Sequence, residues 1–351
     1  MIRLTIGITI YNRRKTLERM IESLLASHLD DSGVTYTIRV YDDCSVEYTE
    51  NDVRDMFPIQ IEYYRHESNR GADYNMGYMY RDFLVKGDDI LFNCDSDLIF
   101  DIEWLSRVME YLPHTDGILS LFNTKQHSTV EKVGKLCVKE TVGNAGTVMT
   151  RHAVELICDA IDEKESYTLL DHNWCKLYKK LGKKIYCTSR SYVQHIGFDG
   201  FNSSQGAMDI GENFVISGDT NGQILGDVLY DVVLHKKEVA EEKRSIYYLF
   251  PFDRIAAGAK LVIYGAGVVG NDYRSQVELC GYCGSVVQVD KNYRNLTGVH
   301  GPEELKTIDC DYILIAAHFA SIREEMQADI LSIDPKLENK LISDVCYSIR
   351  I

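Results

Sequence analysis

The sequence predicts an α/β protein with two domains, each built on a sheet whose strands alternate with helices. Its 351 residues suggest two domains of ordinary size. Strand and helix signals alternate over the first half of the chain, and a second alternation begins near residue 260 around a glycine-rich loop. Because strands that alternate with helices form mostly parallel sheets, we expect helices on both faces of each sheet.

The first half of the chain contains short β-rich runs separated by segments with apolar side chains at helical spacing. The predicted strands are residues 4–10, 35–41, 59–63 and 89–94, and the predicted helices are residues 17–25 and 73–84. In such sheets, ligands bind at the carboxyl ends of the strands. We therefore expect the functional site where these strands end.

The second half of the chain shows the same alternation of strands and helices. It follows a mixed stretch in which apolar residues have helix-like spacing at residues 224–233. Strands are predicted at residues 260–264, 285–289 and 312–316, and a helix from about residue 321. The predicted organisation is a first domain with a mixed sheet flanked by helices at residues 1–210, a connection at residues 211–257, and a smaller α/β domain at residues 258–351.

Composition excludes several classes of protein. The net charge of −15 argues against broad binding of nucleic acid or anionic lipid, which requires a basic face. No apolar run reaches the ~18–20 residues of a membrane-spanning helix, and the start of the chain lacks the zones of a signal peptide. The ten cysteines are scattered, as expected in a reducing cytosol. We expect a cytoplasmic protein that works beside the inner face of a membrane.

Polar clusters follow three of the predicted strands. They are Tyr11-Asn12-Arg13, Asp42-Asp43-Cys44-Ser45 and Asp95-Ser96-Asp97. Two carboxylates two residues apart can hold one divalent cation together with the diphosphate of a nucleotide. A solvated turn is the alternative for an isolated Asp-x-Asp, because acidic turns are common. Three such clusters at three strand ends favour a shared binding site.

A longer series of motifs runs through the first half of the chain. In chain order they are Thr9-Ile-Tyr-Asn12, Asp42-Asp-Cys-Ser45, Asn69-Arg-Gly71, Asp95-Ser-Asp97, the glycine-rich segment at residues 143–151, Leu170-Asp171 ahead of Gly182, and Val193-Gln-His195. Over about residues 1–205, this order resembles the nucleotide-sugar-binding half of family 2 glycosyltransferases, which have the GT-A fold. Leu170 stands where the family usually has a glutamate, and Cys44 where it often has a glycine.

This resemblance implies an inverting transfer from a nucleotide-diphosphate sugar, expected to be a UDP-sugar, to a glycan or lipid-linked glycan in bacterial surface polysaccharide synthesis. It implies a Mn²⁺ or Mg²⁺ cofactor held by Asp97 and His195, with Asp171 as the catalytic base. The donor-binding residues that it implies are Thr9, Tyr11, Asn12, Arg13, Asp42, Asp43, Arg70, Asp95 and Ser96, and the acceptor-side residues are Gly146, Thr147 and His172.

Two of these residues have structural alternatives. Asp171 can instead be a helix N-cap, a common role for aspartate. His195 can be a strand histidine bonded to a backbone carbonyl.

A second motif, Gly265-Ala-Gly267-Val-Val-Gly270, follows a predicted strand, and Asp290 ends the next strand. This is the context of a dinucleotide-binding fingerprint, in which the acid bonds a ribose. The segment resembles the truncated Rossmann-like tails of bacterial polysaccharide enzymes, because only about half of a two-lobed dinucleotide domain fits after residue 260. A packing module or a homo-oligomer contact is therefore favoured over bound NAD.

Two other functions compete with the transferase. An NAD(P)-dependent oxidoreductase or epimerase would use the C-terminal glycine loop, but it leaves the N-terminal motifs unexplained, and no Tyr-x-x-x-Lys follows the loop. A nucleotide-sugar-binding protein without transferase activity is opposed only by Asp171 and His195.

Overall fold

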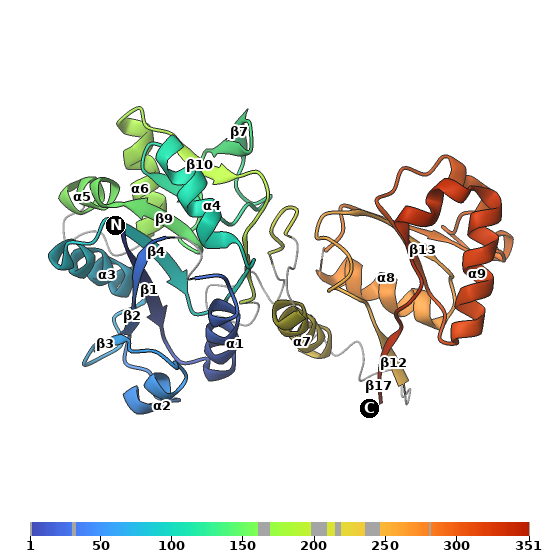
Figure 1. Cartoon of the computed structure of the whole chain (residues 1–351), viewed down its shortest axis with the longest axis horizontal. Coiled ribbons are helices and arrows are strands. Elements are labelled where there is room, and N and C mark those ends of the chain that lie inside the picture. Colours follow the sequence, from blue (N-terminus) through green and yellow to red (C-terminus); the bar gives the residue numbers. More distant parts are fainter. Residues whose placement is uncertain are drawn as a thin grey trace. The chain divides into compact units, whose positions relative to one another are not determined.

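The chain forms two compact units, Met1–Gly197 and Phe198–Ile351 (Figure 1). The structure is a computed structural model, and it describes residues 2–29, 33–160, 169–197, 209–214, 219–235, 246–280 and 282–350. Part of the predicted connection, residues 246–257, lies in the second unit. There β12 (Ile246–Leu249) pairs with β17 (Tyr347–Arg350), so this stretch contributes to a folded unit.

In its described part, the first unit contains a nine-stranded mixed sheet in the order β3-β2-β1-β4-β9-β6-β10-β8-β7. The strands are β1 (Arg3–Ile10), β2 (Thr35–Asp42), β3 (Glu62–Arg65), β4 (Ile90–Asp95), β6 (Ile118–Ser120), β7 (Thr129–Val133), β8 (Leu136–Lys139), β9 (Thr147–Thr150) and β10 (Ile185–Thr188). The first four in this order are parallel, and β9 is antiparallel to both of its neighbours. A separate pair, β5 (Leu98–Phe100) and β11 (Val193–His195), is antiparallel.

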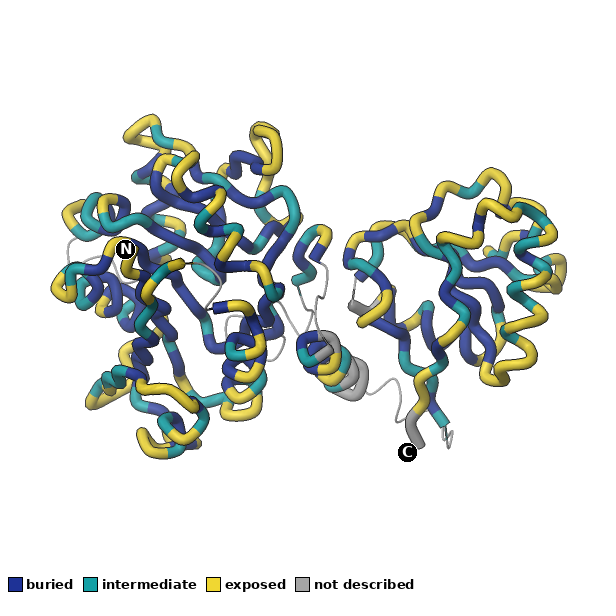
Figure 2. Tube along the Cα trace, viewed as in Figure 1, coloured by how far each residue is buried: buried dark blue, intermediate teal, exposed yellow. Residues whose placement is uncertain are grey.

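Helices cover both faces of this sheet because successive side chains of a strand point to opposite faces. In β4, Phe92 packs in the core beneath α1 (Arg14–Leu25) and α4 (Trp104–Tyr111), whereas Leu91 packs beneath α3 (Ala72–Lys86), α5 (Arg151–Ala160) and α6 (Leu170–Lys180). A short helix, α2 (Glu50–Asp55), lies between β2 and β3. The central strands are buried, while exposed residues concentrate on the outer helices and loops (Figure 2). The predicted mixed sheet flanked by helices is confirmed.

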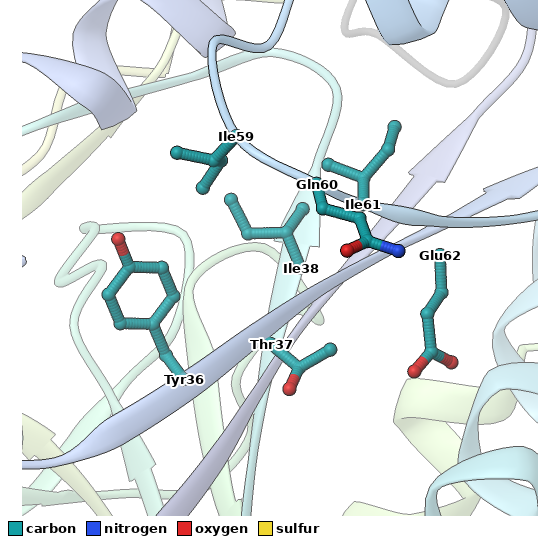
Figure 3. Close-up of a pocket in the computed structure, with 7 residues that line it drawn as sticks. All are labelled: Tyr36, Thr37, Ile38, Ile59, Gln60, Ile61 and Glu62. Carbon is teal, nitrogen blue, oxygen red and sulfur yellow. The ribbon is translucent and has the colours of Figure 1, made fainter.

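One predicted strand is displaced. Residues 59–63 were expected to pair, but β3 begins at Glu62 and pairs with the second half of β2, from Arg39 to Asp42. Residues 59–61 instead line an open depression of about 300 Å³ against the start of β2 (Figure 3). The start of β2 is the opposite end of the strand from the predicted site, so the depression is separate from that site.

The second unit contains a four-stranded parallel sheet in the order β14-β13-β15-β16. The strands are β13 (Lys260–Tyr264), β14 (Ser285–Val289), β15 (Tyr312–Ile315) and β16 (Leu341–Ile342), and the helices are α7 (Asp219–His235), α8 (Val268–Cys280) and α9 (Ala320–Ile333). This sheet confirms the predicted smaller α/β domain. Among the described residues of the whole chain, no helix is long and apolar enough to span a bilayer.

The glycine loop of this unit is shaped by close backbone packing. Gly265 has φ +122°, and a Cβ there would lie 2.8 Å from the carbonyl oxygen of Ala316. A Cβ on Gly270 would lie 1.9 Å from the carbonyl oxygen of Gly265, whereas a Cβ on Gly267 would meet nothing within 4 Å. Gly265 and Gly270 are therefore required by packing, and Gly267 is not.

Gly270→Ala should accordingly destabilise the second unit by about 2 kcal/mol, because the added methyl group forces the loop backbone away from α8. Gly267→Ala is the matched control and should change the free energy of unfolding by less than about 0.5 kcal/mol. Urea unfolding of the full chain measures both. Equal stabilities of the two variants would show that the loop relaxes freely around Gly270.

Candidate functional site

The three polar clusters meet at one edge of the first sheet. β1, β2 and β4 run parallel, and their ends are in register: Thr9 is opposite Tyr41 in β2 and Asp95 in β4. Parallel strands place their carboxyl ends together, and this edge is where ligands bind in α/β sheets. The sequence clusters are therefore neighbours in space.

Asp95, Asp97 and His195 offer ligand atoms that lie within 4.8 Å of one another. Asp95 ends β4, Asp97 precedes β5, and His195 ends β11. The antiparallel pairing of β5 with β11 sets His195 opposite Leu98, and Ile196 N donates to the carbonyl oxygen of Asp97 at 2.8 Å. This two-stranded sheet thus joins two segments that are far apart in the sequence.

Charge pairing stabilises the group. Arg13 Nη1 donates to Asp97 Oδ2 at 2.7 Å, and His195 Nε2 lies 3.1 Å from Asp97 Oδ1. Burial alone would raise the pKa of Asp97, but His195 and Arg13 hold it below its usual range. Burial and the charge of Asp97 raise the pKa of Asp95, against the opposing effect of His195. Burial would lower the pKa of His195, but Asp97 raises it.

The geometry of the group fits a divalent cation. Asp97 Oδ1 is buried and receives no hydrogen bond of acceptable angle from the described residues, although His195 Nε2 lies nearby. A proton on His195 Nε2, or a divalent cation between the two atoms, would satisfy this oxygen. A Cβ on Gly197 would lie 2.3 Å from Asp97 Oδ2 and 2.9 Å from His195 Cε1, so the bare Cα of Gly197 lets these two side chains pack against it. Carboxylate and imidazole ligands suit Mn²⁺ and related ions.

The residues after β1 hold a neighbouring loop. Asn12 and Arg13 both have left-handed backbones, with φ of 51° and 61°. Asn12 N donates to Ser45 Oγ at 2.8 Å, and Asn12 Oδ1 accepts from Val46 N at 2.8 Å. The turn therefore directs the Asn12 side chain to the loop after β2 and the Arg13 side chain to Asp97. Donor binding by Asn12 stays a prediction.

Asp42 is fully buried and has many internal partners. Its carboxylate accepts from Ser45 N at 2.9 Å, Ser45 Oγ at 2.5 Å and Tyr63 OH at 2.7 Å, and it pairs with Arg65. A donor nucleotide would have to share or replace these partners. The donor-binding role predicted for Asp42 therefore has less support from the geometry than the donor-binding role predicted for Asp95 or the metal-binding role predicted for Asp97.

The side chain of Asp43 contacts the backbone of Arg70. The carboxylate of Asp43 accepts from Arg70 N at 2.8 Å and from Gly71 N at 2.7 Å, where α3 begins. The guanidinium of Arg70 lies over the ring of Tyr74, 4.2 Å from its centroid. Asp43 thus orients the loop that presents Arg70.

The other predicted donor-side residues lie at the same edge. Tyr11 is 45% exposed, and its ring is open to a ligand. Thr9 is partly exposed at the end of β1, and Ser96 is buried between the two acids.

Asp171 is the second residue of α6, so it is not the N-cap residue. The N-cap residue is Leu169, which has a left-handed backbone and makes no side-chain capping bond. Asp171 Oδ1 accepts from His172 N at 2.6 Å. Burial raises the pKa of Asp171, the neighbouring charge of Asp73 adds to this effect, and the hydrogen bond from His172 opposes it. The carboxylate is thus half-buried and more basic than usual.

The predicted acceptor-side residues differ in what they can do. Thr147 is buried in β9 and donates through Oγ1 to the carbonyl oxygen of Gly143 at 2.9 Å, so its hydroxyl serves the turn before the strand. Gly146 has φ +67°, and a Cβ there would lie 2.5 Å from Val193 Cγ2. His172 is exposed on α6. Of the three, His172 has the most accessible side chain.

Sequence reasoning missed two residues that influence the acidic groups, Asn144 near Asp95 and His127 near Asp171. Asn144 accepts from Tyr80 OH at 3.1 Å, and a hydrogen bond from Asn144 also moderates the pKa of Asp95. His127 bonds Thr141 Oγ1 through Nδ1 at 2.9 Å. Asn144 could have been found as the polar residue within the glycine-rich segment at residues 143–151. No local signal marked His127.

The C-terminal fingerprint acid is engaged by its own loop. Asp290 Oδ2 accepts from Ala266 N at 2.7 Å, and Asp290 Oδ1 accepts from Asn292 N at 2.7 Å. The carboxylate expected to bond a ribose therefore orders the glycine loop. A nucleotide site at Gly265, Gly267, Gly270 and Asp290 stays a prediction.

Solved structures with some similarity include three transferases. They are the mannosyltransferase PcManGT from Pyrobaculum calidifontis in complex with GDP-Man and Mn²⁺ (14% identity, TM-score 0.41, 54% of this chain and 55% of that chain), S. aureus TarS 1-349 in complex with UDP-GlcNAc (13%, 0.45, 66% and 66%), and GalNAc-T7 with UDP, GalNAc and Mn²⁺ (11%, 0.45, 56% and 44%). This chain spans less than two thirds of each of them.

A comparison with curated proteins finds no match. Residues 5–144, which contain β1, β2, β4 and the two acids Asp95 and Asp97, match the family Glycosyl transferase family 2. The match spans four of the motif groups that carried the resemblance. Residues 5–144 therefore match a family 2 glycosyltransferase domain, as the order of their motifs predicted.

Proposed function

We propose that the protein is a metal-dependent, inverting glycosyltransferase that moves a sugar from a nucleotide-diphosphate sugar, a UDP-sugar, to a hydroxyl of a glycan or lipid-linked glycan. The observation that carries the proposal is the group Asp95, Asp97 and His195 at the carboxyl edge of a family 2 domain. The pathway is the synthesis of a bacterial surface polysaccharide, in the cytoplasm at the inner face of the membrane.

Asp95, Asp97 and His195 would hold Mn²⁺ or Mg²⁺. When bound, the cation neutralises the charge that develops on the departing diphosphate. Arg13 keeps Asp97 ionised and adds a cationic group on the same side of the site. His195 must be neutral to act as a ligand, so binding of the cation releases its proton.

Asp171 would accept the proton of the attacking hydroxyl. An inverting displacement needs a base beside the acceptor, and its efficiency rises as the pKa of the base approaches the working pH. Burial raises the pKa of Asp171 in that direction. Its second carboxylate oxygen has no hydrogen-bond donor among the described residues, so one oxygen is oriented by His172 N and the other is available for the proton.

The proposed function is tested by exposing the full chain to UDP-, GDP- and dTDP-sugars and to NAD, each with and without Mn²⁺. A true ligand raises the melting temperature, because it binds the folded state. Release of nucleoside diphosphate in the presence of glycan acceptors then measures transfer. Stabilisation by NAD alone, with no response to any sugar nucleotide, would favour the oxidoreductase alternative.

Asp97→Asn should abolish Mn²⁺-dependent donor binding, because an amide cannot neutralise the cation or hold Arg13 and His195 in place.

Gly197→Ala should weaken Mn²⁺ binding at least tenfold, since its Cβ would displace the Asp97 and His195 side chains.

Gly143→Ala is the matched control, because its Cβ would meet only His127 Nε2, at 3.8 Å. Titration with Mn²⁺, followed by electron paramagnetic resonance, measures all three variants. Full sugar transfer by a metal-free preparation treated with EDTA would contradict the assignment.

Asp171→Asn should leave donor affinity within a few-fold of the parent and reduce transfer by about 10²–10⁴-fold, the usual contribution of a positioned base. The substitution keeps the size of the side chain and removes its proton acceptor. Initial rates at saturating donor measure the effect. A variant that keeps more than about a tenth of the parent rate would move the search to Asp199 or Glu165, both of which lie outside the described residues.

A further inference from the structure

Two helices on the same face of the first sheet begin beneath a carboxylate from an earlier element. Asp43, just after β2, accepts the backbone N–H groups of Arg70 and Gly71 at the start of α3. Asp73, in the first turn of α3, repeats the arrangement: Oδ2 accepts from Leu169 N at 2.9 Å and Oδ1 from Leu170 N at 3.0 Å, at the start of α6. Free N–H groups and the helix dipole favour a negative charge at both places.

The N-cap residue of α6 makes no capping bond with its own side chain. Leu169 has φ 56° and ψ 48°, a left-handed conformation that disfavours a leucine, and its side chain is exposed. The bonds to Asp73 are the capping bonds that the described structure provides at this point. Asp171 follows two residues after Leu169, so the direction of its carboxylate depends on how this turn is held.

The body of α6 is anchored independently. Trp174 and Tyr178 are fully buried in the core beneath the sheet, and Cys175 Sγ lies 3.6 Å from the carbonyl oxygen of Val142 as a weak donor. The helix therefore stays docked without Asp73. What Asp73 controls is the first turn, which carries Asp171.

We propose that Asp73 is a positioning residue of the sugar transfer: by receiving the N–H groups of Leu169 and Leu170, it sets the orientation of Asp171 relative to the donor-side loop. This inference rests on the proposed function. The loop that presents Arg70 continues directly into the turn that holds Asp73. Donor-side and acceptor-side groups are thereby tied to one rigid helix start.

The surroundings of Asp171 supply a readout that a purely structural role would not change. The titratable groups that act on it are Asp73 from α3, His127 from the loop after β6, His172 and Cys175 on its own helix, Asp95 at the end of β4, and Tyr80 from α3. The negative charge of Asp73 contributes to the raised pKa of Asp171. Removing that charge lowers this pKa, so the acid limb of the rate profile moves to lower pH.

The experiment compares Asp73→Ala, Asp73→Asn and Asp73→Glu in the full chain. In Asp73→Ala, kcat for transfer should fall at least tenfold, with the donor KM within about threefold of the parent. In Asp73→Asn, kcat should fall less, because the amide keeps one acceptor oxygen. The acid limb of its rate profile should shift to lower pH. Asp73→Glu should recover part of kcat, because it keeps two acceptor oxygens.

Asp89→Asn is the matched control. Asp89 Oδ2 also accepts a distant backbone N–H, that of Arg3 at 2.9 Å, but at the opposite end of the strands from the site. This variant should keep the parent kcat and pH profile. Hydrogen exchange of the amides of Leu169 and Leu170 should accelerate in Asp73→Ala and stay unchanged in Asp89→Asn, whatever the activity.

The possible results separate the two proposals. If the parent protein transfers no sugar under any donor and metal, the proposed function fails, and the positioning role fails with it. If the parent is active but Asp73→Ala keeps more than half of kcat, or loses it only in step with a collapse of the folded state, the positioning role alone is overturned. A loss of kcat at constant KM with accelerated exchange at Leu169 and Leu170 supports it.

Discussion

The buried carboxylate of Asp97 is the constraint on which the rest of the site depends. With 5% of its surface exposed, an ionised Asp97 requires compensating charge or strong hydrogen bonds. Arg13 and His195 supply the charge, and each comes from a different part of the chain. The left-handed turn at Asn12 and Arg13, the β5–β11 pairing and the bare Cα of Gly197 are all needed to bring these groups together. The geometry of this candidate metal site therefore follows from how one buried charge is compensated.

The local part of this arrangement could be predicted from the sequence. The strands β1, β2 and β4 are short β-rich runs, and the polar clusters that follow them had to meet at one edge because parallel strands end together. The sequence pattern could not show which acids stay open to a ligand. Asp42 and Asp95 are equivalent as strand-end acids, yet Asp42 is surrounded by Ser45, Tyr63 and Arg65. That distinction depends on long-range contacts.

The strands in the second half of the first sheet could not be predicted from local sequence pattern either. β6, β9 and β10 have only three or four residues each, too few for alternation to identify a strand. The displaced β3 has the same origin, because its pairing is set by β2 and not by its own apolar residues. Asp73 was missed for a related reason: its partners, the N–H groups of Leu169 and Leu170, are 96 and 97 residues away in the sequence. No spacing rule connects them.

The acidic residues of this chain serve two purposes, and their hydrogen-bond donors tell the two apart. Asp43, Asp73 and Asp290 each accept two backbone N–H groups, so their charge orders the backbone. For Asp43 and Asp73 both donors lie at a distant helix start, and for Asp290 one lies in the glycine loop and one in its own turn. Within the described residues, Asp95 and Asp97 receive only side-chain donors. A side chain can rotate away or change its protonation when a ligand arrives, whereas a backbone donor is fixed by the fold. The acids suited to a cation are thus the two that accept no backbone N–H group from the described residues. In the second unit, the acid after β14 is already bonded to the glycine loop, so that loop has the character of a packing element.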